Sequence, residues 1–155
     1  MGEYAGAVGD LDATGMRFAI IAARFNQDIT EPLAAGAEKV LREHGAADVW
    51  VVWVPGAFEL PLAAKRFAQS GRVDAVVCIG AVIRGETAHF EYVAGECAAG
   101  VTRASLDTGI PVAFGVLTVE DRQQALDRVG GSEGHKGEEA AVTAIEMVSL
   151  LRTLP

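Results

Sequence analysis

Gly85, Glu86, Thr87 and His89 place residue types that can bind an anion next to one that can transfer a proton. The apolar spacing that follows indicates a helix beginning at His89, so the other three residues precede a helix N-terminus. Backbone N–H groups and the helix dipole attract anions there, and a glycine permits close approach. The Glu86 carboxylate should then point away, so that only its amide contributes. On these residues alone, Thr87 as a simple helix cap is the favoured alternative.

His89 lies in the first turn of that predicted helix, at the positive end of its dipole. A neutral imidazole at this position can accept and donate protons near pH 7. A histidine that only caps or packs is an equally good interpretation of the residue by itself. His44 ends an earlier predicted helix and is interpreted as structural. No two of the three histidines have the spacing of metal ligands, so we expect no metal site.

Two glycine-containing stretches look like nucleotide-binding motifs but lack the residues that define them. Residues 130–136 (GGSEGHK) lack the glycine-lysine-serine or -threonine ending of a phosphate loop. Residues 80–85 (GAVIRG) lack the middle glycine of a dinucleotide fingerprint. The sequence therefore predicts neither a nucleoside-triphosphate site nor a nicotinamide site.

Short apolar runs of strand length alternate with helical patterns along the chain. The predicted strands are Arg17–Ala23, Asp48–Val54 and residues 73–83 and 111–117. The predicted helices cover residues 30–44, 58–69, 89 to about 105, 121–128 and 138–152, with a glycine-rich loop at 130–137. Continuously apolar strands that alternate with helices indicate a parallel sheet covered on both faces. We therefore predict a three-layer α/β/α sandwich, with a flavodoxin-like four-stranded parallel sheet and helices on both faces.

The chain of 155 residues is long enough for one ordinary domain. We assign residues 17–155 to that domain and residues 1–16, which show no clear pattern, to an N-terminal arm that could add a strand to a neighbouring subunit. The last predicted helix is apolar almost all round, so one small sheet cannot cover it. Another subunit is the expected second cover.

Charge and composition limit the class of protein further. Lys and Arg number 13 against 21 Asp and Glu, and the net charge of −8 argues against nucleic-acid binding. Cys78 and Cys97 show no C-x-x-C spacing and are expected to be free thiols in a reducing compartment. No signal-peptide pattern and no apolar run of about 18 residues is present, so we expect no membrane span and a cytoplasmic location.

Ligands of an open parallel sheet bind beyond the carboxyl ends of its strands. The segments that should meet there are rich in aromatic and functional polar side chains, and they are residues 24–26, 55–59, 83–89 and 118–121. This coincidence predicts an enzyme active site at that edge of the sheet.

Several of these segments resemble the lumazine synthases, in order and at that family's spacing over about residues 17–152. They are RFN at 24–26, PGAFELP at 55–61, GAVIRGETAHFEYV at 80–93, and ALDR with GHKGEEA within 125–140. The resemblance implies condensation of 5-amino-6-(D-ribitylamino)uracil with 3,4-dihydroxy-2-butanone 4-phosphate to 6,7-dimethyl-8-ribityllumazine, phosphate and water. No redox change occurs in this reaction, so no cofactor is expected.

The resemblance also implies a role for each matching residue. His89 is the proton-transfer residue. The pyrimidine and ribityl chain are bound by Phe25, Ala57, Phe58, Glu59, Ala81, Val82, Ile83 and Phe114. The phosphate is bound by Gly85, Glu86, Thr87, Arg128 and Lys136. Of these, Phe114, Arg128 and Lys136 are expected to come from the adjacent subunit.

A homopentamer is the assembly that the resemblance implies. The short loop at 130–137 favours a sixty-subunit capsid of twelve pentamers, which could associate with a riboflavin synthase. Glu133, His135 and Asp121 depart from the residues that relatives often carry, Lys, Asn and Asn. Two alternatives stay open: a riboflavin synthase of the same fold, and a non-catalytic flavin-binding or shell-forming protein.

Overall fold

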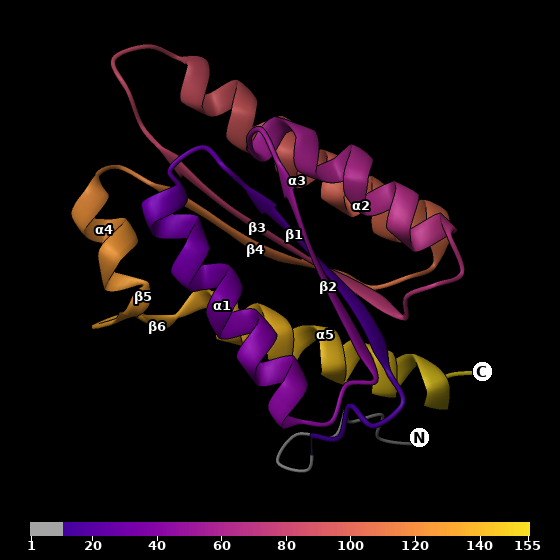
Figure 1. Cartoon of the computed structure of the whole chain (residues 1–155). Coiled ribbons are helices and arrows are strands. Elements are labelled where there is room, and N and C mark those ends of the chain that lie inside the picture. Colours follow the sequence, from indigo (N-terminus) through magenta and orange to yellow (C-terminus); the bar gives the residue numbers. More distant parts are fainter. Residues whose placement is uncertain (1–10) are drawn as a thin grey trace, which may run out of the picture.

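The computed structural model describes residues 11–155 and contains a central sheet of parallel strands in the order β2–β1–β3–β4 (Figure 1). The strands are β1 (Arg17–Ala23), β2 (Asp48–Val54), β3 (Ala75–Ile83) and β4 (Val112–Val119). Strand β1 is paired on both sides, so that Ile20 lies opposite Val51 in β2 and Val77 in β3. The predicted fold class is confirmed.

Helices cover both faces of this sheet (Figure 1). Helices α1 (Gln27–Glu43) and α5 (Lys136–Thr153) pack together on one face, and α2 (Leu60–Gln69) and α3 (His89–Thr108) on the other. A short 3₁₀ helix, η1 (Ala57–Glu59), precedes α2. Helix α4 (Arg122–Asp127) and a two-stranded hairpin of β5 (Val129–Gly131) and β6 (Gly134–His135) connect β4 to α5.

The core has two layers, one on each side of the sheet, because successive side chains of a strand point to opposite faces. On β1, Phe18 and Ile20 face the layer of α1 and α5, whereas Ile21 faces the layer of α2 and α3. All three are fully buried, and so are Leu33 of α1 and Leu60 of α2. A strand that is buried on both faces needs apolar residues at every position, which explains the continuous runs.

Several boundaries differ from the sequence prediction, among them the starts of β3 and α5, and three differences have a local structural cause. Helix α1 begins at Gln27 because Asn26, in the left-handed region, turns the chain directly out of β1. The helix predicted from Phe58 is regular only from Leu60, after the 3₁₀ turn. Residues 130–137 are not a simple loop, because positive φ angles at Gly130 (84°) and Gly134 (79°) accompany the hairpin.

The N-terminal arm is described only from residue 11, and residues 1–10 of the predicted arm lie outside the described residues. Thr14 forms an antiparallel bridge with Ala46, and the Ala13 amide donates to the His44 carbonyl at 2.8 Å. The side chains of Ala13 and Met16 are buried. This part of the arm therefore packs on its own chain.

Helix α5 retains an uncovered face in the single chain. Ala141, Ala144 and Ile145 are buried against the sheet layer, but Met147 and Leu151 are 37% and 40% exposed. Beside α5, the edge strand β4 pairs only with β3 within the described sheet. An apolar helix face next to an unpaired strand edge is a surface that another chain can cover.

Candidate active site

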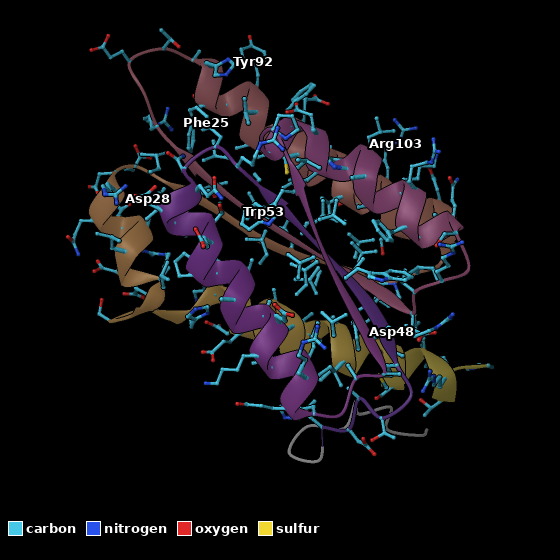
Figure 2. The ribbon with its side chains drawn as sticks, viewed as in Figure 1. Phe25, Asp28, Asp48, Trp53, Tyr92 and Arg103 are labelled. Atoms are coloured by element: carbon cyan, nitrogen blue, oxygen red, sulfur yellow. The ribbon has the colours of Figure 1, made fainter. Side chains whose placement is uncertain are left out.

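A crevice of about 750 Å³ opens at the carboxyl ends of β1 and β3, beside the first turns of α3. Figure 2 shows Phe25 and Tyr92 at this end of the molecule and Asp48 at the opposite end. The crevice brings together ten of the residues that the sequence assigned to the site: Phe25, Ala57, Phe58, Glu59, Ala81, Val82, Ile83, Gly85, Thr87 and His89. Phe90, Tyr92 and Val93 of α3 also line the crevice.

The turn from β1 to α1 places Phe25 at the crevice mouth, where its side chain is 71% exposed. The next residue, Asn26, has φ 60° and ψ 45° and is the only non-glycine residue with positive φ in residues 11–155. Asparagine tolerates this conformation better than most residues. Its Nδ2 donates to the Ala81 carbonyl at 2.9 Å, which ties the turn to the crevice wall on β3. The sequence pattern around Asn26 gives no sign of this contact, because Ala81 lies 55 residues away along the chain.

Residues 55–59 form a second wall. The Phe25 amide donates to the Pro55 carbonyl at 3.0 Å, and the Arg24 amide donates to the Val54 carbonyl at 2.8 Å. The β1–β2 pairing therefore continues past the ends of the strands. The 3₁₀ turn that follows leaves Phe58 58% exposed and places Glu59 in the crevice lining. An aromatic face and a carboxylate thus stand on one short turn.

The segment between β3 and α3 contributes Gly85 and Thr87 to the crevice, whereas Glu86 is absent from its lining. The Thr87 hydroxyl accepts a hydrogen bond from the His89 amide at 3.3 Å, although the N-cap residue of α3 is Ala88. A Cβ at Gly85 would meet no atom within 4 Å, so a ligand can approach its backbone.

Phe114, Arg128 and Lys136 lie in a separate groove of about 480 Å³ between β4 and α5. Arg128 directs one guanidinium nitrogen to the Gln124 carbonyl at 2.9 Å. The Lys136 ammonium is 3.2 Å from the Glu139 carboxylate. Within one chain, these three predicted site residues do not reach the crevice.

Four groups in residues 11–155 have shifted pKa values, and hydrogen bonds from Thr14 lower the pKa of one of them, the Asp12 carboxyl. The ion pair with Arg122 lowers the pKa of the Asp28 carboxyl, and it joins the start of α4 to the start of α1. Burial raises the pKa of the Cys97 thiol to about 11 and that of Cys78 further. Both cysteines are free and buried, so neither is a ready nucleophile.

Within residues 11–155, no helix has the length and hydropathy needed to cross a bilayer. In the same stretch, no group of three or more His, Cys, Asp or Glu side chains is arranged to hold a metal ion.

The fold is a flavodoxin-like α/β fold with a crevice beyond the carboxyl ends of its parallel strands, the place where proteins of this architecture bind their ligands. The model of one protein family, 6,7-dimethyl-8-ribityllumazine synthase, matches residues 15–152, and the chain belongs to this family. The family consists of transferases of riboflavin biosynthesis that act on small molecules and form oligomers. The lumazine synthase function predicted from the sequence is thereby confirmed.

Proposed function

We propose that the active site is shared by two neighbouring copies of the chain, one giving the crevice and the other the groove of Phe114, Arg128 and Lys136. The observation that carries this proposal is a mismatch of charge. No Lys or Arg lines the described crevice, although one substrate carries a phosphate. The groove is lined by the positively charged side chains of Arg128 and Lys136, and it lies beside β4, whose outer edge is unpaired in the described sheet. Joining the two surfaces gives the phosphate the charge that the crevice lacks.

The crevice binds the ribitylaminopyrimidine in this proposal. The flat ring of Phe25 suits stacking on a pyrimidine, and Phe58 adds a second apolar face. Backbone groups of Ala81, Val82 and Ile83 at the end of β3 are available to the pyrimidine edge, as in other ligand sites at strand ends. The Glu59 carboxylate accepts hydrogen bonds from the ribityl hydroxyls.

The butanone phosphate binds at the start of α3. The amides of Gly85, Glu86 and Thr87 face the phosphate at the positive end of the helix dipole. Arg128 of the neighbouring copy donates a bidentate pair of hydrogen bonds to the same phosphate, and Lys136 adds a second positive charge.

The reaction needs positioned substrates and proton transfer more than strong chemical activation. The aromatic amine condenses with the ketone and releases water to form an imine. Elimination of inorganic phosphate leaves an enol that tautomerises to a ketone, and the ribitylamino nitrogen attacks that carbonyl and closes the ring with loss of a second water. His89 lies in the crevice lining, where it transfers protons among these steps. Holding two substrates together provides much of the acceleration, while the helix N-terminus and Arg128 favour departure of phosphate.

The assembly that fits a shared site is a closed ring, because each copy contributes different surfaces to its two neighbours. We propose the pentamer, and beyond it the sixty-subunit capsid that the short 130–137 segment favours. The exposed Met147 and Leu151 on α5 and the free edge of β4 support coverage by a neighbour. Light scattering on the purified protein separates the two sizes, and a fully active monomer would contradict the shared site.

The activity itself is tested by mixing the protein with both precursors and following lumazine fluorescence, with a protein-free mixture as the control for spontaneous condensation. Formation of lumazine above that control supports the proposal. Conversion of added lumazine to riboflavin would instead favour a riboflavin synthase of this fold. Flavin binding without turnover would favour the non-catalytic alternative.

A further inference from the structure

The side chain of Arg84, the residue that follows β3, contacts three residues of two segments at the crevice end of the molecule. Its Nε donates to the Glu120 carboxylate at 2.7 Å, and its Nη1 is 3.7 Å from the Glu91 carboxylate. The guanidinium carbon lies 4.5 Å from the centroid of the Phe90 ring. Glu91 and Phe90 belong to the first turn of α3, and Glu120 follows β4.

These contacts hold both ends of the segment from Gly85 to Ala88. At its beginning, the Arg84 amide donates to the Val119 carbonyl at 2.9 Å. At its end, the guanidinium contacts Phe90 and Glu91, so Arg84 contacts the chain on both sides of the segment that the proposed function assigns to the phosphate. Each contact is weak because the Arg84 side chain is 38% exposed. Together they limit the positions that the segment can adopt.

The contacts of Arg84 also reach toward the groove of the same chain, which in the proposed assembly completes the crevice of a different copy. The Glu120 amide donates to the Gln124 side-chain oxygen at 2.8 Å. The Arg128 guanidinium in turn donates to the Gln124 carbonyl at 2.9 Å. A continuous series of hydrogen bonds therefore connects Arg84, beside the crevice, with Arg128, in the groove.

We propose that Arg84 is a positioning residue for phosphate binding, which rests on the function proposed above. It holds the amides of the β3–α3 segment in place and neutralises two carboxylates that would otherwise repel an approaching anion. It does not bind the phosphate itself, because it is absent from the crevice lining and its charge faces Glu91 and Glu120. A planar guanidinium can stack on the Phe90 ring and, at the same time, donate in its plane to two carboxylates, which a lysine ammonium cannot do.

The test measures both Michaelis constants and kcat for Arg84→Ala, with Arg103→Ala as a matched control. Arg103 is an exposed residue farther along α3 and outside the crevice lining (Figure 2). We expect Arg84→Ala to raise the KM of the butanone phosphate about three- to tenfold, from the combined loss of ion pairs and ring stacking. The KM of the pyrimidine should change less than about twofold, and Arg84→Lys should recover part of the loss.

Glu120→Gln and the double variant Arg84→Ala/Glu120→Gln show whether the effect acts through the contact. The two single effects on the KM of the butanone phosphate should not add, because both remove the same interaction. Equal changes in both KM values, additive effects, or no change in Arg84→Ala would each overturn the inference. Wild-type protein in the same assay keeps this test separate from the proposed function, because lumazine formation by wild type is required for either outcome.

Discussion

The crevice beside β3 and the groove along β4 carry different chemistry on neighbouring strands. The crevice presents Phe25, Phe58 and His89 and contains no Lys or Arg in its described lining. The groove presents Arg128 and Lys136 with a single aromatic ring. One surface suits a flat ring and a proton transfer, and the other suits an anion. Neither surface alone has the groups that a phosphate-eliminating condensation uses.

The two regions also differ in what fixes them. The crevice walls are joined by backbone hydrogen bonds between strand ends and by the Asn26 amide. The groove lies on β4, whose outer edge is unpaired in the described sheet and exposes 44% of Phe114. An interior can be organised by its own chain, whereas an edge strand is completed by a neighbour. This difference fits the proposed shared site, in which the crevice is organised within one chain and the groove lies at an edge that a neighbour can cover.

Among single substitutions that put an uncharged residue in the crevice or the groove, His89→Ala should lower activity most. General acid–base help is worth about a hundredfold at its lower end, and we expect kcat to fall by no more than that, because proximity of the substrates survives. Stopped-flow measurement of lumazine formation across about pH 6–8, the range in which histidine titrates, checks this. His44→Gln, on the far end of α1, is the control. A variant whose rate and pH profile equal those of wild type would remove His89 from the mechanism.

Arg128→Ala removes a positive charge from the groove and should weaken the binding of only one substrate, the butanone phosphate. Loss of a charged hydrogen-bond donor is worth about 1.5–3 kcal/mol, so the KM of the butanone phosphate should rise at least about tenfold. The KM of the pyrimidine should hardly change. Arg122→Ala, at the start of the short helix that Arg128 follows and outside the groove lining, serves as the matched control. Equal effects on both substrates would show that Arg128 only holds subunits together.

Glu59→Gln should give the smallest effect and the opposite substrate selectivity. The amide still accepts a hydrogen bond but without a charge, so we expect the KM of the pyrimidine to rise only about threefold. The KM of the butanone phosphate should stay the same. Glu96→Gln, an exposed substitution on α3, is the control. A rise in the KM of the butanone phosphate instead would contradict the assignment of Glu59 to the pyrimidine substrate.

Much of the fold followed from the sequence because the central strands are buried on both faces. The bounds of β1 and β2 agree with their apolar runs, Arg17–Ala23 and Asp48–Val54. The β5–β6 hairpin did not follow, because its strands are too short for periodicity and depend on the positive φ of Gly130 and Gly134. Local pattern predicts long elements well and short ones poorly.

The candidate site was predictable to different degrees. Residues 24–26, 55–59 and 83–89 were placed together because parallel strand ends meet at one edge of a sheet. The roles of Asn26 and Arg84 depend on contacts between segments far apart in sequence, such as Asn26 with Ala81. No periodicity reveals such contacts. The assignment of Arg128 to a neighbouring copy came from family resemblance, and nothing in its local pattern indicates it.

Subunit complementation tests the shared site most directly. Thr87→Asp keeps an oxygen that can accept the His89 amide but adds a negative charge beside the phosphate, whereas Arg128→Glu reverses the charge of the groove. Each variant alone should be nearly inactive at low butanone phosphate. In oligomers co-expressed from equal amounts of both, about one interface in four joins an intact crevice to an intact groove, so about a quarter of wild-type activity should return. Mixed oligomers no more active than the separate variants would contradict a site shared between chains.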